Sequence, residues 1–485
     1  MTARARSGRA FEDVVRARTE ADFVEREWLY DEIERALDSD RGQYVLVTGE
    51  PGTGKTSLLA GMARAYPERL RYFFRRDSRI ALTGGDIQSF LLSIGHQLAR
   101  VRPELFKLEH LEVVIKQHIE SVEAEGRVVG IRIEDLSVSP FHRTATLEVE
   151  QRVGTLSGQA HAVEIGSARL EPRLLDPDNL AHLALIGPAQ VLAEQDPDAR
   201  IVILLDALDE IADDDTTERK KGLLHWLARS PELPANVKVV ITSRPHAGLR
   251  LFRSAREDRL TDVAIDASSP QVVGDLHTYA DLVFERPAVI AAERARGNLL
   301  GSTKRYAVRM AAGNFLYLAT YARALIEATT EQDDEMVDRL LVFSGVPGRL
   351  NGLYGFFVEL LREELTPWPR DGAAHEPTSW DGVGLPIIGV LTVAREALTE
   401  NQLTALSGTP AQEAPAQKVL ASLRWLLDRR GDRIAFFHTS INEFLAGQEA
   451  REKHPECWVD ETRWHEQIAR HYRGTAPNWA DVDWP

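Results

Sequence analysis

Cysteine and long apolar runs are nearly absent from this sequence. Its 485 residues include a single cysteine, Cys457, so the chain can form no disulfide with itself and offers no cysteine-based zinc site. No apolar stretch approaches the ~20 residues that a membrane-spanning helix needs. The basic residues 1–10 lack the apolar core of a signal peptide. These absences favour a protein of the reducing cytoplasm that does not contact a membrane.

The charge balance is acidic, with a net charge of −16. Such a charge argues against broad nucleic-acid binding, although it is compatible with a local basic patch. Hydrophobic residues make up 44% of the chain and charged residues 27%, which is ordinary for a globular protein. The length predicts about two to four domains.

A glycine-rich segment that ends in Lys-Thr is the most informative stretch of the chain. Residues 49–56 fit the pattern G-x-x-x-x-G-K-[ST], between an apolar run at 44–47 and a helical pattern. This strand–loop–helix setting is typical of a phosphate-binding loop, whose backbone N–H groups and helix dipole attract a polyphosphate. The residues predicted to contact the nucleotide are Gly49, Glu50, Pro51, Gly52, Thr53, Gly54, Lys55, Thr56 and Ser57.

Specific roles follow for two of these residues and for an acidic strand end. Lys55 would reach the β- and γ-phosphates of ATP, and the Thr56 hydroxyl would bind Mg²⁺. The apolar, β-branched run 201–205 predicts a strand buried in a parallel sheet. Asp206 would lie at its carboxyl end, where ligands of such sheets bind, and would hold the same Mg²⁺ opposite Thr56.

Asp209 and Glu210 follow Asp206 within one turn. One of them would orient or deprotonate the attacking water, and we slightly favour Glu210. The alternative is a solvated acidic loop that continues through residues 213–215. Arg244 ends the next apolar strand, within 236–245. Its guanidinium could contact the γ-phosphate, or it could be a surface arginine before a proline turn.

The pattern of apolar, polar, glycine and proline residues along the chain suggests five segments. Residues 1–22 form a polar segment, and 23–265 an α/β nucleotide-binding domain with a parallel sheet. Alternating apolar residues at about 109–175 predict a small antiparallel β insertion within it. Residues 266–375 read as a helical domain with a proline-rich end, 380–450 as a compact module, and 451–485 as a helix and the start of a further region.

Taken in order, these segments resemble STAND-type signalling ATPases of the NACHT group. These proteins are nucleotide switches related to plant and animal immune receptors and to bacterial anti-phage sensors. The resemblance implies an α/β P-loop NTPase fold, a helical domain and a winged-helix domain at 380–450, with Val24 on the adenine side of the nucleotide. It is carried by residues 23–27, 49–56, 204–210, 240–245, 312–317, 347–354, 387–399 and 436–445.

Two positions depart from the pattern of the family. Glu25 and Ala207 stand where the family often has glycine. The first departure affects the loop on the adenine side. Because alanine is small, we expect the second to have little effect.

The resemblance also implies a mechanism. ADP would hold the three domains closed, with His438 near the β-phosphate as a latch, and activation would bring self-association. A neutral imidazole can donate to a phosphate oxygen, although His438 could instead be a buried structural histidine between Phe437 and Thr439. Sensor or effector partners would lie outside this chain.

Two other functions remain open at this stage. The runner-up is an origin-recognition-like AAA ATPase that uses the winged helix on DNA. Its candidate recognition helix carries four cations but also many apolar residues, which are typical of a helix that packs internally. We therefore do not expect it to bind DNA directly. The third possibility is a scaffold that binds nucleotide only for structure. The four cations are Lys418, Arg424, Arg429 and Arg430.

Overall fold

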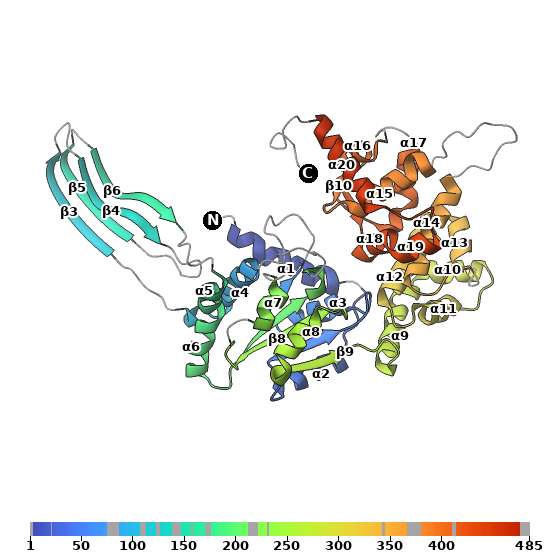
Figure 1. The fold of residues 1–485 in the computed structure, drawn as a ribbon, viewed down its shortest axis with the longest axis horizontal. Helices are drawn as coiled ribbons and strands as arrows, with labels where there is room; N and C mark the ends of the chain where they lie inside the picture. The colour runs from blue at the N-terminus through green and yellow to red at the C-terminus, as the bar shows by residue number, and fades with distance from the viewer. Residues whose placement is uncertain are drawn as a thin grey trace.

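The computed structural model describes residues 3–20, 22–74, 87–106, 113–122, 127–137, 147–156, 159–169, 176–211, 222–229, 232–341, 345–365, 380–409 and 414–475. We call residues 22–265 the α/β region, 266–365 the helical region and 380–475 the C-terminal module. The helical region lies beside the α/β region and below the C-terminal module (Figure 1). No helix in the described ranges combines the length and the apolar character needed to cross a membrane.

A parallel five-stranded sheet forms the centre of the α/β region, in the order β2-β7-β8-β1-β9. The three central strands are almost entirely buried, as their β-branched sequences predict. Their carboxyl ends lie at one edge of the sheet, which therefore receives the glycine-rich loop, Asp206 and Arg244. The strands are β1 (Tyr44–Thr48), β2 (Leu70–Phe73), β7 (Ile201–Asp206), β8 (Val237–Ser243) and β9 (Leu260–Ala264).

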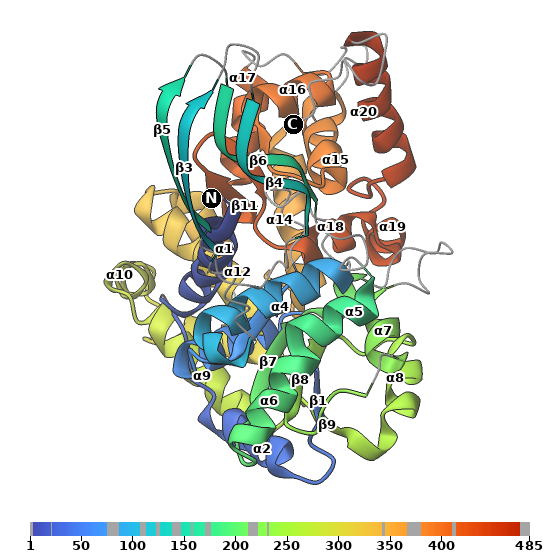
Figure 2. The same ribbon diagram turned by 90° about the vertical axis from the view of Figure 1, so that its left-hand side faces the viewer.

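Helices flank this sheet (Figure 2). The helix α3 follows the glycine-rich loop directly and buries Leu58, Leu59 and Met62. The longer helices of the region are α2 (Glu27–Asp38), α3 (Lys55–Ala65), α4 (Ile87–Val101) and α6 (Gly187–Gln195). The shorter ones are η1 (Pro103–Leu105), α5 (Pro177–Ala181), η3 (His182–Ile186), η4 (Leu208–Ile211), α7 (Leu223–Arg229), α8 (Leu249–Ala255) and η6 (Glu257–Arg259).

The polar N-terminal segment forms a helix that packs on the α/β region. The helix α1 (Ala3–Thr19) buries Phe11 and Val14, three positions apart on one face. The ring centroid of Phe11 lies 5.6 Å from that of Tyr72 on β2, and Arg64 on α3 donates to the Thr19 carbonyl at 3.0 Å. The small apolar stripe of α1 therefore docks it on the α/β region.

The β-rich insertion is present, but its strands do not pair as we expected. The strands are β3 (Val113–Val122), β4 (Arg127–Ser137), β5 (Leu147–Leu156) and β6 (Gln159–Arg169). β3 pairs with β5 and β4 with β6, both in parallel, so the antiparallel prediction was wrong. Alternating apolar residues indicate strands but do not specify their partners. The four strands project away from the rest of the molecule (Figure 1).

The described part of the helical region contains six helices, and their core is rich in tyrosine. Tyr317, Tyr321 and Leu325 on α12 are fully buried. The Asn314 side chain caps α12 by accepting from the Tyr317 N–H. The helices are α9 (Pro270–Phe284), α10 (Pro287–Ala295), α11 (Ser302–Ala311), α12 (Phe315–Thr330), α13 (Asp334–Leu341) and α14 (Leu350–Leu365). The proline-rich stretch predicted at the end of this region falls within residues 366–379, which are outside the described part of the structure.

The C-terminal module combines helices with an antiparallel sheet of order β10-β12-β11. A capping box between Thr399 and Gln402 starts α16. The strands are β10 (Leu398–Thr399), β11 (Leu427–Arg430) and β12 (Arg433–Phe436). The helices are η7 (Trp380–Gly384), α15 (Leu385–Val393), α16 (Glu400–Ser407), α17 (Ala414–Ser422), η8 (Arg424–Leu426), α18 (Thr439–Ala446), α19 (Gln448–Lys453) and α20 (Glu461–Thr475).

Candidate nucleotide-binding site

The loop between β1 and α3 has a backbone that requires glycine at two positions. Gly52 and Gly54 have φ angles of +81° and +84°, in the left-handed region that glycine enters freely. A Cβ atom on Gly52 would lie 2.3 Å from Oδ1 of Asn314. A Cβ atom on Gly49 would lie 2.7 Å from Oγ1 of Thr53. These glycines keep the loop narrow and its backbone accessible.

The start of α3 supplies donors for an anion. Gly54 is the N-cap residue, and no side chain among the described residues caps this helix. The N–H groups of Lys55, Thr56 and Ser57 belong to the first turn, where no preceding turn can accept from them. The positive end of the helix dipole adds to their attraction for negative charge. This cradle fits a polyphosphate.

The ammonium group of Lys55 lies over the loop. Its Nζ atom donates to the Gly49 carbonyl at 2.6 Å and to the Glu50 carbonyl at 3.0 Å. Burial lowers the pKa of Lys55 to about 8, and the negative charge of Asp209 opposes this shift most strongly. A phosphate group in the cradle would give this poorly hydrated cation a strong partner.

Asp206 and Thr56 come together from different elements, β7 and α3. Asp206 is 2% exposed, and its Oδ1 atom accepts from Oγ1 of Thr242 at 2.6 Å. Burial raises the pKa of the Asp206 carboxyl, and hydrogen bonds from Thr242 and Thr56 oppose that rise. A hydroxyl and a carboxylate in contact are two oxygen ligands of the kind that Mg²⁺ prefers. The pair fits the magnesium site that the sequence predicts.

The residue after Asp206 has an unusual backbone. Ala207 has a φ angle of +55°, and its N–H donates to Oγ1 of Thr242 at 3.0 Å. An L-residue is strained in this region, whereas glycine is not. The resembling family often has glycine here, and the geometry gives the physical reason.

Arg244 is held by carboxylates rather than solvated. Its backbone N–H donates to Oδ1 of Asp209 at 3.0 Å, and its Nε atom lies 3.1 Å from Oδ2 of the same residue. Its Nη1 atom donates to Oε2 of Glu443 on α18 at 2.7 Å. Asp209 and Arg244 therefore lie together at the edge of the sheet that carries the glycine-rich loop. Glu210 lies on η4, and its side chain is outside the described part of the structure.

His438 is the N-cap residue of α18 in the C-terminal module. Its Nδ1 atom accepts from the Ser440 N–H at 3.1 Å and lies 2.8 Å from Oγ of Ser440, which in turn lies 2.8 Å from the hydroxyl of Tyr354. Burial lowers the pKa of His438 to about 3, and the positive charges of Arg18, Arg244 and Lys55 add to this effect. The ring is therefore neutral, and its proton is on Nε2.

The helical region binds the glycine-rich loop through hydrogen bonds that the sequence did not predict. The N–H groups of Phe315 and Leu316 donate to the Gly52 carbonyl at 2.9 and 3.3 Å. The Nδ2 atom of Asn314 donates to the Pro51 carbonyl at 2.8 Å. The start of α12 thus binds the outer side of the loop, and residues 312–317 were the only sequence signal for it.

A buried arginine makes a similar link from the segment that precedes α2. Arg26 donates from Nη1 to the Thr53 carbonyl at 2.9 Å and from Nε to Oδ2 of Asp275 at 3.0 Å. Its guanidinium lies 5.3 Å from the ring centroid of Phe315. The predicted adenine-side residue Val24 is half-buried two positions earlier. Glu25 points elsewhere, 3.6 Å from Arg64.

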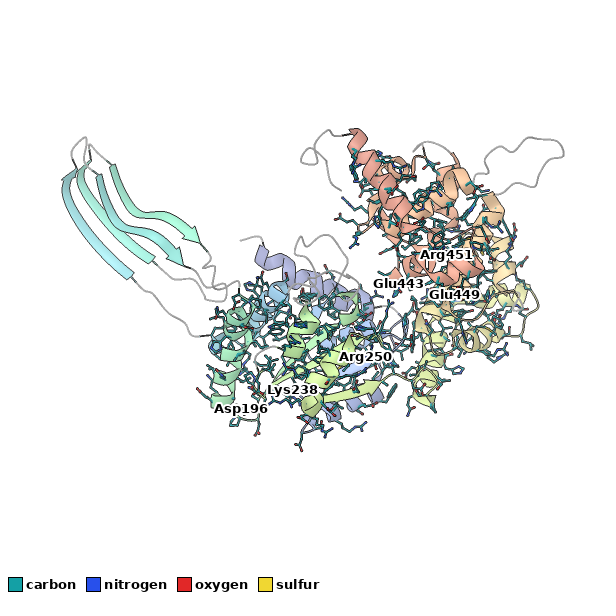
Figure 3. The ribbon with its side chains drawn as sticks, in the orientation of Figure 1. Asp196, Lys238, Arg250, Glu443, Glu449 and Arg451 are labelled. Atoms are coloured by element: carbon teal, nitrogen blue, oxygen red, sulfur yellow. The ribbon has the colours of Figure 1, made fainter. Side chains whose placement is uncertain are left out.

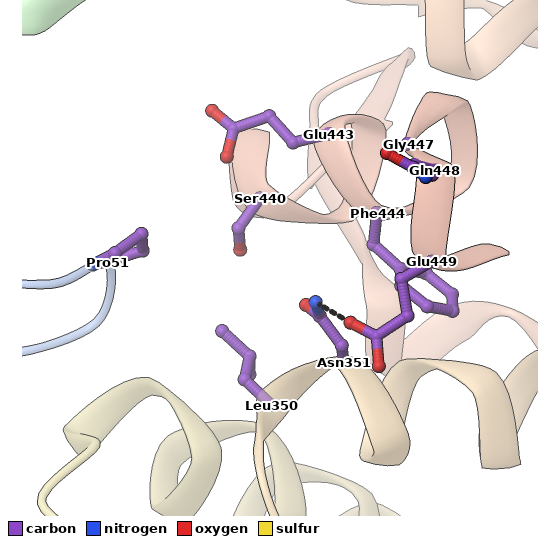
Figure 4. Close-up of a pocket in the computed structure, with 9 residues that line it drawn as sticks. All are labelled: Pro51, Leu350, Asn351, Ser440, Glu443, Phe444, Gly447, Gln448 and Glu449. Atoms are coloured by element: carbon purple, nitrogen blue, oxygen red, sulfur yellow. Dashed lines mark hydrogen bonds between the residues drawn. The ribbon is translucent and has the colours of Figure 1, made fainter. Parts of the chain in front are cut away.

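A cavity of about 250 Å³ separates the loop from the C-terminal module. Pro51 borders it on one side, and Ser440 and Glu443 face it from α18 (Figure 4). The remaining wall is formed by the start of α14 and by α19, where Asn351 donates to Glu449 at 2.6 Å. The cavity places polar groups of the module opposite the loop.

Comparison with known proteins agrees with this geometry for the first half of the chain. A family model described as an AAA ATPase domain matches residues 22–241. No curated protein matches the chain. The matched range contains the glycine-rich loop, Asp206, Asp209 and most of the sheet. Residues 22–241 are thus an AAA ATPase domain of the P-loop NTPase superfamily, which implies nucleotide binding, usually with Mg²⁺, and nucleotide hydrolysis.

Proposed function

We propose that this chain is a switch ATPase of the STAND/NACHT type. It binds ATP or ADP with Mg²⁺, hydrolyses ATP slowly, and changes its conformation and oligomeric state with the nucleotide. One observation carries the proposal. Arg244, at the carboxyl end of β8, donates to Glu443 on α18 of the C-terminal module at 2.7 Å, and the positive charges of Arg244 and Lys55 add to the effect of burial in lowering the pKa of His438 on the same module. The module therefore covers the same site that the loop and the sheet build.

The arrangement of the three regions supports a closed state of such a switch. The loop is bonded to α12, and Arg244 is paired with Glu443 of the module. The antiparallel sheet β10-β12-β11 with α16 and α17 supports a winged-helix domain within the module. A site that joins three regions can bias their relative positions when its occupant changes.

The roles of the residues follow from their chemistry. Lys55 and the first N–H groups of α3 bind the phosphates, and Thr56 with Asp206 holds Mg²⁺. When bound, Mg²⁺ supplies charge neutralisation at the phosphate oxygens. Asp209 or Glu210 orients the water, with Glu210 preferred because Asp209 is already engaged by Arg244.

His438 acts as the latch in this proposal. Its Nδ1 atom is occupied by Ser440, so only Nε2–H is left to donate to a phosphate oxygen. The same imidazole caps α18, which makes its position rigid. A hydrogen bond that forms only in the closed state would stabilise that state.

Isothermal titration and size-exclusion chromatography of the full chain test this function. With Mg²⁺ present, we expect ADP and β,γ-imido-ATP to bind, and the two complexes to elute differently. Lys55→Ala should abolish binding, whereas the exposed Lys453→Ala should not. Absence of binding for both nucleotides, with identical elution, would refute the proposal.

We further propose that activation leads to self-association, and that sensor or effector partners outside this chain set the trigger and the output. A role in defence signalling in the cytoplasm is the setting that the resemblance suggests. Sedimentation of the protein with the ATP analogue at several concentrations would measure self-association directly. A monomer at every concentration would contradict it.

A further inference from the structure

Arg244 lies between two carboxylates that belong to different regions. Asp209 of the α/β region is 3.1 Å from its Nε atom, and Glu443 of the C-terminal module is 2.7 Å from its Nη1 atom. Glu443 is on the side of the module that faces the α/β region (Figure 3). The side chains of Arg244 and Glu443 are 25% and 43% exposed, so the contact is partly hydrated.

We propose that Glu443 makes the closed conformation selective for ADP over ATP. It does so by holding the guanidinium that a γ-phosphate would otherwise contact. This inference rests on the proposed function, since it assigns a role within the same nucleotide site. It concerns a residue of the C-terminal module, outside the matched ATPase domain.

The chemistry of the guanidinium underlies the competition. Carboxylate and phosphate groups bind the planar N–H fork of arginine in the same way. A third phosphate therefore competes with Glu443 for Arg244, and it also places new negative charge near Glu443 and Asp209. Like charges brought together at a partly dehydrated site weaken binding. ADP lacks the competing group and does not meet this cost.

The position of Glu443 on α18 links this competition to closure. Ser440 and Glu443 are three residues apart and so share one face of the helix, and both line the cavity opposite Pro51. His438 caps the same helix. Docking of α18 therefore delivers the imidazole and the carboxylate together. The imidazole of His438 can donate to a phosphate oxygen, and the carboxylate of Glu443 binds the guanidinium of Arg244.

Titration of the full chain with ADP and with β,γ-imido-ATP, both with Mg²⁺, tests the inference. The quantity of interest is the ratio of the Kd for ADP to the Kd for the analogue. Glu443→Gln keeps the shape of the side chain and removes its charge. Because the pair is partly exposed, we expect the ratio to rise about five- to tenfold. The control Glu452→Gln removes an exposed carboxylate from the same module and should leave the ratio unchanged.

The outcomes separate this inference from the proposed function. Wild-type protein that binds neither nucleotide overturns both. Wild-type protein that binds both, with an unchanged ratio in Glu443→Gln, overturns only the role of Glu443. An equal shift in Glu452→Gln also overturns it, because the effect would then come from net charge.

A second variant tests whether Glu443 acts through Arg244. In an Arg244→Gln background, Glu443→Gln should change the ratio by less than about twofold, since the competed group is gone. A full shift in that background would overturn the mechanism. Thermal unfolding of each variant confirms that it is folded. If Glu443→Gln does not fold, Glu443→Ala provides an independent substitution that also removes the carboxylate.

Discussion

Strain at a single residue marks the acidic end of β7. Ala207 adopts a left-handed backbone between Asp206, which contacts Thr56 and Thr242, and the η4 turn that carries Asp209. Its N–H is fixed by Thr242, so the strain cannot relax by rotation of the peptide. The backbone here is determined by the site rather than by the preference of alanine.

Ala207→Gly should therefore stabilise the protein. We expect an increase of about 1 kcal/mol in the free energy of unfolding, because glycine has no Cβ to strain at this φ angle. Urea unfolding of wild type and variant measures the difference. Ala207→Val provides the opposite comparison and should destabilise, and a loss of stability in Ala207→Gly would contradict the assignment of strain.

Lys55 should make nucleotide binding dependent on pH. Its pKa is lowered to about 8, with Asp209, Arg244, Asp206 and Glu50 as the charged groups around it. Only the ammonium form binds phosphate well. The affinity for ADP should therefore be constant below pH 8 and fall by up to tenfold per pH unit above it, where phosphate groups are already fully ionised.

Titration calorimetry from pH 7 to 9.5 measures this dependence. Lys55→Arg is the matched control, because a guanidinium stays charged over the whole range. Its affinity, even if lower, should not change with pH. A flat profile for the wild type would show that Lys55 keeps its proton without a ligand.

At the scale of elements, the N-terminus of α12 contacts the glycine-rich loop, and Ser440 near the start of α18 faces the cavity that Pro51 of the loop borders. The first N–H groups of α12 bond to the Gly52 carbonyl, and the N-cap residue of α18 is His438. Each helix thus couples its own cap to the site. A substitution that keeps the helix cap but removes the contact with the loop or the nucleotide can separate the effect on stability from the effect on nucleotide binding.

Asn314 is the first such position. Its Oδ1 atom caps α12 and its Nδ2 atom donates to the Pro51 carbonyl. Asn314→Asp retains the cap but loses the donor, so nucleotide affinity should fall several-fold with little change in stability. Asn314→Ala should lose both, with about 1 kcal/mol of stability. Equal affinities for wild type and Asn314→Asp would argue against a role of this contact in holding the loop.

His438 can be separated in the same way. His438→Asn keeps an acceptor for the Ser440 N–H and so a cap, but its short side chain should not reach a phosphate. We expect both His438→Asn and His438→Ala to release ADP faster, about tenfold, whereas only His438→Ala should lose stability. Stopped-flow measurement of fluorescent ADP release provides the rates. Slower release in either variant would contradict the latch.

The sequence predicted the local parts of this site but not its long-range contacts. The loop of residues 49–56 and the strand ending at Asp206 are defined by neighbours in the chain, so pattern alone located them. The contacts of Asn314 with Pro51 and of Arg26 with Asp275 depend on how the helical region docks. The antiparallel pairing predicted for the insertion was wrong for a related reason, because apolar and polar residues alternate in the same way in parallel and antiparallel strands.

At the scale of the whole molecule, Lys418 and Arg424, two of the four basic residues that suggested DNA binding, are engaged in ion pairs. Lys418 lies 3.2 Å from Glu364, and Arg424 lies 2.7 Å from Glu331. Val419, Leu420 and Leu423 around them are buried. These contacts agree with the expectation that this part of the module packs internally.

Duplex DNA should therefore bind weakly. With a net charge of −16, we expect a Kd above roughly 10 μM at physiological salt, which is the non-specific range. Fluorescence anisotropy with labelled duplex measures it, and bovine albumin serves as an acidic control protein. Tight, salt-sensitive binding would instead favour an origin-recognition-like ATPase.

One helix connects the two ends of the proposed switch. The N-terminus of α12 holds Gly52, and halfway along it Arg323 donates to the Leu427 carbonyl and lies over the ring of Phe437, next to His438. A 16-residue helix is a stiff rod of about 24 Å. Tilting the module should therefore pull on the phosphate loop mechanically, so that opening and nucleotide release become a single event.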